Sequence, residues 1–360
     1  MSIHEKFMRR TLRLALKAKG KTSPNPLVGA LVVRGREIVG EGFHRKAGLP
    51  HAEIVALERA KGKTEGAILY VTLEPCSTYG RTPPCLNRIL EAKIKRVIIG
   101  MLDPNPVNKG KAIKILEKNN VDVKVGFLEE EIKKINEPFI KYVTKRLPFV
   151  TVKVGQSLDG KIATRKGESK WVTSEKSREY AKRLRRFYDA IMVGVNTVIR
   201  DNPELRDGKF KVIVDSNLRI PPNAKIFSKN PNSVIIATLK DKRRKKRERL
   251  EKIGVRILEI REKDRRVDLL GLLKRLAKLE ITNILVEGGG KLIGSLFDRG
   301  LIDKVMFFIS TLKIIGGKDA VSSVEGKGIT NLKRVTRLED VKIKRLGEDI
   351  LVEGYVHRYN

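Results

Sequence analysis

The sequence predicts two consecutive α/β domains, and three observations indicate them. The chain has 360 residues, more than one compact core usually fills. Short β-branched runs alternate with segments whose apolar residues recur at helical spacing, which is typical of layered α/β domains. This alternation is interrupted at Arg146-Leu147-Pro148 and then resumes. We therefore expect one domain over residues 1–146 and a second over residues 147–360.

The first domain is expected to begin with a helix, continue with a pair of strands and then alternate. Phe7, Leu12 and Leu14 are spaced for one helix face, and the Arg34-Gly35-Arg36 turn separates two short strands. A β-branched and aromatic run at 67–73 predicts a central strand. The expected helices are 5–18, 52–60, 86–92, 112–118 and 129–141, and the expected strands are 30–33, 37–40, 67–73, 96–100 and 122–127.

The second domain is expected to open with a long, valine-rich strand and to continue with alternating strands and helices. Two further strands close the chain, where they could pair as a hairpin against the sheet. The expected strands are 149–154, 190–195, 211–214, 233–238, 283–286, 304–309 and 349–357, and the expected helices are 177–187, 269–279 and one from Leu292.

Composition excludes several classes of protein. Hydrophobic residues make up 41% of the chain, which is enough apolar material to bury and argues against long disorder. No uninterrupted apolar run reaches about 18 residues, and the N-terminus does not resemble a signal-peptide core. Two cysteines cannot form a disulfide framework. We therefore expect a cytoplasmic protein without a membrane partner.

The charge of the chain does not by itself indicate a partner. Lys and Arg number 77 against 42 Asp and Glu, which leaves a net charge of +35. The positive residues are spread along the chain, apart from one dense run, Lys240–Arg249, which we interpret as a solvated helix or loop. Glutamine occurs only at Gln156, whereas Lys, Arg, Glu and Ile are abundant, a composition typical of hyperthermophile proteins.

Four residues of the first domain form a pattern suited to a catalytic zinc ion. His51 and Glu53 lie at the start of an expected helix, Cys76 follows an expected strand, and Cys85 opens the next helix. One imidazole and two thiolates are three good ligands for one Zn²⁺ per chain, leaving a fourth position for water. Glu53 could accept the proton of that water and pass it to leaving ammonia. A structural zinc site would need a fourth ligand, and only His44 lies nearby in the sequence.

The order His-x-Glu, Pro-Cys, Cys is the signature of zinc deaminases. In nucleic-acid base deaminases two residues separate the cysteines, whereas this chain has eight, residues 77–84. The longer spacing argues against a polynucleotide substrate.

The residues around this pattern resemble the bifunctional riboflavin-biosynthesis deaminase/reductase family. The resemblance lies in 22–30 (TSPNPLVGA), 42–53 (GFHRKAGLPHAE), 73–77 (LEPCS) and 80–85 (GRTPPC). It implies a cytidine-deaminase-like three-layer α/β/α domain that deaminates a diaminopyrimidinone bearing a phosphoribosylamino group. By the same resemblance Asn25 and His44 line the substrate pocket, and His44, Lys46 or Arg81 lies near the phosphate.

The second domain carries a glycine turn between a strand and a helix. Residues 284–290 (ILVEGGG) place three glycines where backbone N–H groups could approach a phosphate at a helix start. A tight turn explains three glycines equally well. The Rossmann G-x-G-x-x-G spacing is not met, because Gly290 is followed by Gly294. A phosphate-binding turn therefore remains open, and a Rossmann dehydrogenase is disfavoured.

The family resemblance extends through this half, in 157–163 (SLDGKIA), 167–174 (GESKWVTS), 201–205 (DNPEL) and 287–289 (EGG). It implies a dihydrofolate-reductase-like α/β domain that uses NADPH to reduce the ribosyl group of the deaminated pyrimidine to a ribityl chain. The residues it assigns to NADPH are Gly155, Trp171, Thr197, Asp201, Ser216, Gly289, Gly290, Lys291, Leu292, Ile293, Gly294 and Ser295. Those it assigns to the substrate are Ser169, Arg185, Leu205, Arg206 and Glu287.

Two positions depart from simple expectation. The family has an Arg three positions after the Leu of DNPxL, whereas Leu205-Arg206-Asp207-Gly208 is abbreviated here, so Arg206 is taken as the substitute. Asp215 ends a strand, which in a Rossmann fold would favour NAD over NADP. That rule does not transfer to a dihydrofolate-reductase-like fold, so we keep NADPH.

Two alternative functions compete with this interpretation. One is an RNA-binding protein built on a deaminase-like domain, anchored by the basic run Lys240–Arg249. The other is a deaminase whose second domain only mediates oligomerisation. We expect instead a homo-oligomeric enzyme with a phosphorylated pyrimidine substrate and no nucleic-acid partner, whose basic surface attracts anionic ligands.

Overall fold

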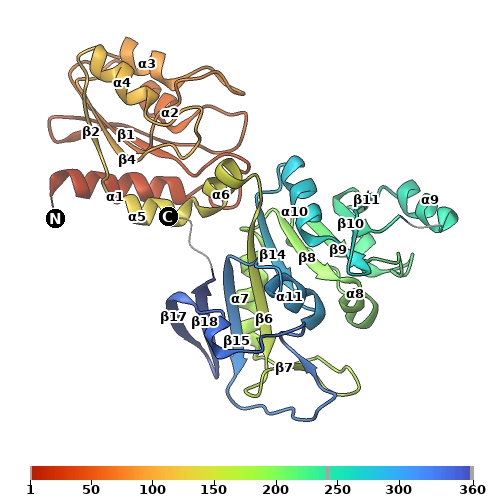
Figure 1. The fold of residues 1–360 in the computed structure, drawn as a ribbon. Coiled ribbons are helices and arrows are strands. Elements are labelled where there is room, and N and C mark those ends of the chain that lie inside the picture. Colours follow the sequence, from red (N-terminus) through yellow and green to blue (C-terminus); the bar gives the residue numbers. More distant parts are fainter. Residues whose placement is uncertain (1, 241–242, 357–360) are drawn as a thin grey trace. The chain divides into compact units, whose positions relative to one another are not determined.

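The computed structural model describes residues 2–240 and 243–356, and the chain divides into two compact units, residues 1–146 and 147–360 (Figure 1). Each unit is an α/β domain built on its own sheet. The expected α/β fold of both halves is therefore confirmed.

The first unit is a three-layer α/β/α domain. Its sheet has the order β2-β1-β3-β4-β5, in which β1 is antiparallel to β2 and β3, while β3, β4 and β5 are parallel. Helices α1 and α5 cover one face of the sheet, and α2, α3 and α4 cover the other (Figure 1). The strands are β1 (Gly29–Arg34), β2 (Glu37–Phe43), β3 (Ile68–Leu73), β4 (Arg96–Met101) and β5 (Asp122–Val125). The helices are α1 (Ile3–Leu16), α2 (Ala52–Arg59), α3 (Cys85–Glu91), α4 (Lys111–Lys118), α5 (Glu129–Ile135) and α6 (Glu137–Lys145).

Glycines on β2 allow α2 to lie directly against the sheet. A Cβ atom on Gly40 would stand 2.1 Å from the carbonyl oxygen of Ala56, and one on Gly42 would stand 2.4 Å from that of Ala52. Both carbonyls belong to α2, so its backbone approaches the strand more closely than any side chain permits. This contact sets the position of the helix that carries Glu53.

A buried carboxylate connects the ends of β3 and β4. Glu74 directly follows β3 and accepts backbone hydrogen bonds from Asp103, Gly110 and Ala112, with N···O distances of 3.0–3.2 Å. These N–H groups lie in the loop after β4 and at the start of α4, where backbone donors lack helical partners. Glu74 thereby holds that loop beside Cys76.

The second unit is built on a nine-stranded sheet in the described part of the chain, with the order β11-β10-β9-β8-β14-β6-β15-β18-β17. The strands from β11 to β15 are parallel, and β18 and β17 extend the sheet antiparallel. The sheet strands are β6 (Phe149–Gln156), β8 (Ala190–Gly194), β9 (Phe210–Val214), β10 (Val234–Thr238), β11 (Arg256–Glu259), β14 (Asn283–Glu287), β15 (Lys304–Ser310), β17 (Glu339–Leu346) and β18 (Asp349–Tyr355).

Helices and short strands complete this unit. The helices are α7 (Glu175–Arg185), α8 (Val195–Asp201), α9 (Arg244–Lys252), α10 (Leu269–Lys278) and α11 (Gly290–Phe297). Two short ladders pair β7 (Lys161–Ala163) with β16 (Val321–Ser322) and β12 (Glu262–Lys263) with β13 (Arg266–Val267). Three 3₁₀ turns are η1 (Lys225–Phe227), η2 (Pro231–Ser233) and η3 (Leu332–Arg334).

Several expected elements differ from those observed. The expected helix 129–141 is two helices separated at Asn136, whose side chain accepts a hydrogen bond from Leu27 N and donates one to Leu27 O. The expected strand 190–195 ends at Gly194, because α8 begins at Val195. The two C-terminal strands are adjacent and antiparallel, as β15 and β18, but the hairpin partner of β18 is the unexpected β17. His357, the expected last residue of the C-terminal strand 349–357, lies outside the described residues.

We predict that Gly40→Ala lowers the free energy of unfolding of the first unit by about 1–3 kcal/mol, because the new methyl group overpacks the contact with α2. Calorimetry of the full chain would measure the thermal transition of this unit. Gly80→Ala is the matched control, because a Cβ there meets nothing within 4 Å, and it should change stability by less than about 0.5 kcal/mol. Equal transitions for the two variants would contradict the prediction.

Candidate functional site

The three expected zinc ligands lie together in the first unit. His51 Nδ1 is 3.1 Å from Cys85 Sγ and 3.5 Å from Cys76 Sγ, and the three ligand atoms all lie within 4.8 Å of one another. His51 immediately precedes α2, Cys76 follows the end of β3, and Cys85 is the first residue of α3. Atoms bound about 2.0–2.3 Å from one tetrahedral zinc ion lie roughly this close together. The donor set therefore fits zinc.

Thr82 contacts the other nitrogen of the His51 ring, an interaction that the sequence did not indicate. Its Oγ1 lies 3.1 Å from His51 Nε2, while Nδ1 faces both sulfur atoms. A hydrogen bond on the distal nitrogen fixes the orientation of a metal-binding imidazole. Thr82 belongs to the segment between the two cysteines, so this longer segment has a structural use.

The two cysteines differ in their surroundings. A hydrogen bond from the Cys85 side chain lowers the pKa of Cys76, and the backbone N–H of Cys85 also donates to Cys76 Sγ over 3.2 Å. The hydrogen bond to Cys76 and burial raise the pKa of Cys85. One thiolate is thus already favoured at Cys76, and a cation between the sulfur atoms would favour the second.

Glu53 lies in the first turn of α2 and is buried. Burial raises its pKa to about 7, although the neighbouring His51 opposes the shift. Its carboxyl group interacts with the side chain of Cys85, which places it at the edge of the ligand trio. A carboxyl group that titrates near neutrality is well matched to proton transfer in both directions.

Asn25 and His44 form a second pair beside the trio. Asn25 Nδ2 is 3.1 Å from His44 Nε2, and the rings of His44 and His51 meet edge to face with centroids 5.2 Å apart. His44 Nδ1 lies 3.2 Å from the Pro50 carbonyl, which can only accept a hydrogen bond. Nδ1 of His44 therefore carries the proton, and Nε2 accepts a hydrogen bond from Asn25 Nδ2. Burial lowers the pKa of His44, which favours this neutral form of the ring.

In the second unit, Arg185 and Glu287 form a bidentate ion pair. Arg185 Nε and Nη2 donate to Glu287 Oε1 and Oε2 over 2.6 and 2.9 Å. Lys153 Nζ lies 3.8 Å from the same carboxylate, a contact that the sequence did not indicate. Burial alone would raise the pKa of Glu287, but the charges of Lys153 and Arg185 outweigh it and lower the pKa. The carboxylate is therefore ionised at neutral pH.

The residues expected to contact NADPH follow the carboxyl ends of four neighbouring parallel strands. Gly155 lies near the end of β6, Thr197 in α8 after β8, Ser216 after β9, and Gly289 after β14. Ligands of open parallel sheets bind at these ends. Gly288 and Gly289 have φ of +87° and +84°, and Cβ atoms there would lie 3.4 and 3.6 Å from Thr197 Oγ1. Because both residues are glycines, the space between the turn and Thr197 stays open. Such a space beside backbone N–H groups fits a phosphate-bearing cofactor.

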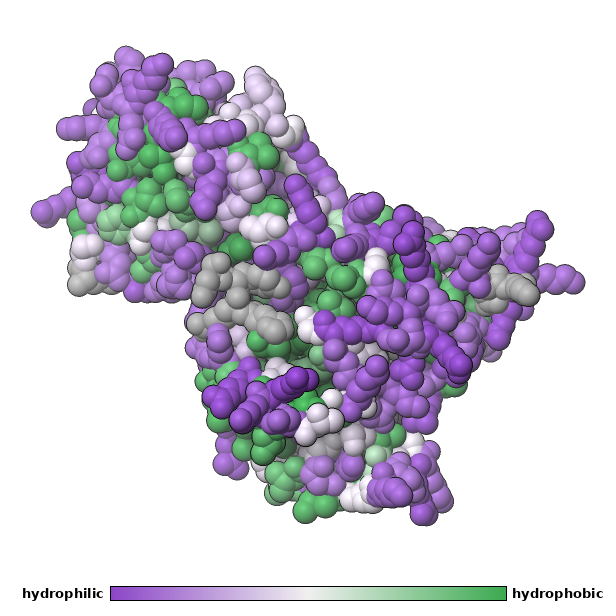
Figure 2. Space-filling view, in the orientation of Figure 1, coloured by the Kyte–Doolittle hydropathy of each residue, from purple (hydrophilic) through white to green (hydrophobic). Residues whose placement is uncertain are grey.

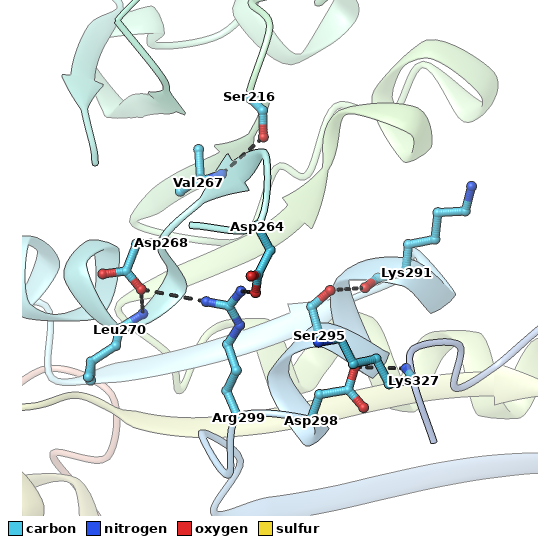
Figure 3. A network of polar contacts seen from close by, with 10 residues as sticks. All are labelled: Ser216, Asp264, Val267, Asp268, Leu270, Lys291, Ser295, Asp298, Arg299 and Lys327. Atoms are coloured by element: carbon cyan, nitrogen blue, oxygen red, sulfur yellow. Dashed lines mark hydrogen bonds and ion pairs between the residues drawn. The ribbon is translucent and has the colours of Figure 1, made fainter. Parts of the chain in front are cut away.

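Other expected contacts are placed around this turn. Figure 3 shows Lys291 with its ammonium group extended away from the helix, while its carbonyl accepts a hydrogen bond from Ser295. Ser169 Oγ donates to Asp201 Oδ1 over 3.0 Å. Trp171 is 60% exposed, and the Cζ atom of the Arg178 guanidinium lies 4.4 Å from the centroid of its ring. An exposed indole is available to a ligand rather than being part of the core.

Gly290 and Gly294, which the family resemblance assigns to NADPH, also have a packing role that the sequence did not indicate. A Cβ on Gly290 would lie 2.2 Å from Ser322 O, and one on Gly294 would lie 1.0 Å from Glu325 O. The backbone of 322–326 therefore lies against α11 at both positions. Leu292 and Ile293 are buried in the core of the unit, so their side chains support the helix.

Arg206, taken above as the substitute for the family's arginine, has no described contact with Glu287. Its guanidinium pairs with Glu204 two residues away, and the pair is solvent-exposed. Leu205 is buried in the core, so only its backbone is available to a ligand. The expected phosphate contact of Arg206 gains no support from the described contacts.

The basic run forms helix α9 over the residues that the structure describes; 241 and 242 lie outside them. Arg244 pairs with Glu248, and Arg247 with Glu251 and Glu259. The surface over α9 is hydrophilic (Figure 2), which matches the interpretation of a solvated helix. Among the described residues, no helix combines the length and apolar character needed to cross a membrane.

Comparisons with known proteins agree with both sites. Residues 1–101 match the model of the cytidine and deoxycytidylate deaminase zinc-binding region, and 148–352 match that of the RibD C-terminal domain. The riboflavin biosynthesis protein RibD of Aquifex aeolicus is 41% identical over 357 residues, covering 97% of this chain and 98% of the relative. The Escherichia coli RibD is 34% identical over 365 residues, with coverages of 96% and 97%.

Solved structures show the same likeness. A structure of Acinetobacter baumannii RibD has a TM-score of 0.88 at 32% identity and covers 98% of both chains. The diaminohydroxyphosphoribosylaminopyrimidine deaminase/5-amino-6-(5-phosphoribosylamino)uracil reductase of Thermotoga maritima has a TM-score of 0.84 at 37% identity, again over 98% of both chains. The second domain matches the RibD C-terminal domain, and the T. maritima relative is named as a reductase, which contradicts the alternative that this domain only mediates oligomerisation. The chain belongs to the RibD family of bifunctional deaminase/reductases of riboflavin biosynthesis.

Proposed function

We propose that residues 1–146 deaminate 2,5-diamino-6-(5-phosphoribosylamino)pyrimidin-4-one and that residues 147–360 reduce the product's ribosyl group to ribityl with NADPH. The observation that carries the proposal is the His51, Cys76 and Cys85 trio with Glu53 buried beside it. The T. maritima relative, 37% identical over nearly the whole chain, has a name that states both activities.

His51 Nδ1 and the sulfur atoms of Cys76 and Cys85 would hold the zinc ion, which supplies a Lewis acid that activates water. Glu53 then takes the proton of the attacking water and delivers it to the departing amino group. Burial keeps bulk water from competing for this proton. Thr82 holds the His51 ring in one orientation during the cycle.

Asn25 and His44 orient the pyrimidine. Their hydrogen bond and the Pro50 carbonyl fix the neutral His44 ring against His51, so that both side chains form one rigid wall of the pocket. Lys46 or Arg81 is the proposed phosphate contact, since each supplies a cation in the same segments. Rigid positioning of the substrate lowers the entropic cost of reaching the reactive geometry.

In the reductase unit, Glu287 and Arg185 form the wall of the substrate site, with Ser169 as a further contact and Leu205 contributing its backbone. The turn at Gly288-Gly289 with Thr197 and Lys291 would hold the phosphates of NADPH, which would supply a hydride when bound. Trp171, Asp201 and Ser216 complete the proposed cofactor contacts. The ionised Glu287 is suited to accept hydrogen bonds from hydroxyl or amino groups of the substrate.

We further propose a cytoplasmic homo-oligomer without a nucleic-acid partner. Two unpaired cysteines in a metal-binding trio support a reducing compartment. The sheet of the second unit ends at β17, an edge strand whose Val341 and Ile343 are 49% and 71% exposed. Two exposed aliphatic side chains on an edge strand are suited to contact with a second copy.

We predict that the purified full chain releases ammonia from the phosphoribosylated diaminopyrimidinone and then oxidises NADPH. Cys76→Ser and Cys85→Ser should each lose zinc and deaminate at under about 1% of the wild-type rate, because two ligands hold the ion poorly. Both variants should still reduce the pre-deaminated substrate, which serves as the control for folding. Retained zinc with full deamination in either variant would contradict the ligand assignment.

We predict that Glu53→Gln keeps the metal but slows deamination by about 10²–10⁴-fold, because the amide cannot accept the water proton. Metal content and ammonia release are measured on the same preparation. Glu58→Gln, an exposed position on the same helix, is the matched control and should keep both. Undiminished ammonia release by Glu53→Gln would mean that another group transfers the proton.

We predict that Glu287→Gln lowers kcat/KM for reduction by about 10–100-fold while deamination is unchanged, because a charge-assisted contact to the substrate is weakened and Arg185 loses its partner. NADPH oxidation and ammonia release are followed separately. Glu175→Gln, exposed at the start of α7, should leave both activities intact. Normal reduction by Glu287→Gln would remove this residue from the substrate site.

A further inference from the structure

The segment after β9 closes into a tight turn around Asp215. The buried Asp215 carboxylate accepts a hydrogen bond from Ile220 N over 2.8 Å, and its carbonyl accepts one from Leu218 N over 3.2 Å. Residues 215–220 are thus held as one unit, and the carboxylate points into it. The next residue, Ser216, is a proposed cofactor contact, and its hydroxyl accepts a hydrogen bond from Val267 N over 3.2 Å (Figure 3).

This geometry prevents Asp215 from selecting NADH. In dinucleotide-binding folds, an acidic residue at such a strand end favours NADH by bonding the ribose 2′-hydroxyl, and it repels a 2′-phosphate. Asp215 is fully buried, with one oxygen bonded within its own turn, so it cannot reach a ribose at the surface. Its position in the sequence therefore carries no preference for NADH.

The same turn presents cations on its outer side. Arg219 is exposed, and its Nη2 donates to Asn196 Oδ1 over 2.5 Å. Arg243, in the segment after β10, donates from Nη1 to the Leu218 carbonyl over 3.3 Å. Asn196 adjoins Thr197 in α8, so Arg219 extends from the end of β9 toward the end of β8. Two guanidinium groups thus lie against one turn, at the strand ends that carry the proposed cofactor contacts.

We propose that Arg219 and Arg243 bind the 2′-phosphate of NADPH and make this chain select NADPH over NADH. The inference rests on the proposed reductase function and deepens it. A phosphate monoester carries close to two negative charges and matches the planar donor fork of arginine. Asp215 acts only as a positioning residue, because its bond to Ile220 N holds the turn that presents Arg219.

The first test is steady-state kinetics of the full-length chain with the deaminated substrate and either NADPH or NADH. Arg219→Ala and Arg243→Ala should each raise KM for NADPH by about 10–100-fold, since a charge-assisted contact is lost, and should leave KM for NADH nearly unchanged. Arg249→Ala, an exposed arginine of α9, removes the same charge and should keep the preference for NADPH. An unchanged preference in both turn variants would overturn the inference.

A binding measurement separates this inference from the reductase function itself. Calorimetry with adenosine 2′,5′-bisphosphate and with 5′-AMP needs no turnover. Wild type should bind the bisphosphate more tightly, and each turn variant should lose that advantage without weaker binding of 5′-AMP. A chain that oxidises neither nucleotide would refute the reductase proposal alone, whereas equal binding of the two probes by wild type would refute the 2′-phosphate site alone.

Discussion

Both sites depend on one constraint of sheet geometry, which is that parallel strands bring their carboxyl ends to the same edge. In the first unit, β2, β3 and β4 run in one direction, so His44 after β2, Cys76 after β3 and the loop after β4 meet at that edge. Strand β1 runs the other way, and its first residue, Gly29, pairs with Phe43 at the end of β2. The segment that precedes β1 therefore brings Asn25 to the same edge, within hydrogen-bond distance of His44.

The buried carboxylates illustrate a second constraint, that charges removed from water need partners. Glu74 meets this need with three backbone N–H groups and thereby joins β3 to the start of α4. Glu287 meets it with Arg185 and Lys153, whose positive charges lower its pKa and keep it ionised. Glu53 has less compensation, and burial raises its pKa to about 7. The same burial therefore gives three roles: a structural cap, a fixed anion and a group that can exchange a proton.

Elements with strong local patterns were predictable, and those that depend on distant partners were not. Strands such as Ile68–Leu73 and Asn283–Glu287 carry consecutive buried apolar residues, as is typical of strands in parallel sheets that are covered on both faces. Strand β17 has mostly polar, exposed residues, so only its pairing with β18 identifies it as a strand. Helix α8 was missed because it is short and begins directly after β8, with no intervening loop to mark its start. Asn136 splits a helix whose local sequence is continuous, by bonding to a backbone more than a hundred residues away.

The sequence by itself predicted the chemistry of the site in the first unit, because His51, Glu53, Cys76 and Cys85 are residue types with few other uses in that order. It also determined the two-domain organisation and the glycine turn after β14. Only the tertiary structure decided that Thr82 holds His51, that Lys153 joins Glu287, and that Gly290 and Gly294 accommodate a crossing backbone. It likewise decided that Asp215 faces inward while Arg219 faces outward. The physical reason is that residue type sets what a group can do, whereas burial and long-range contacts set where it points and which charge it carries.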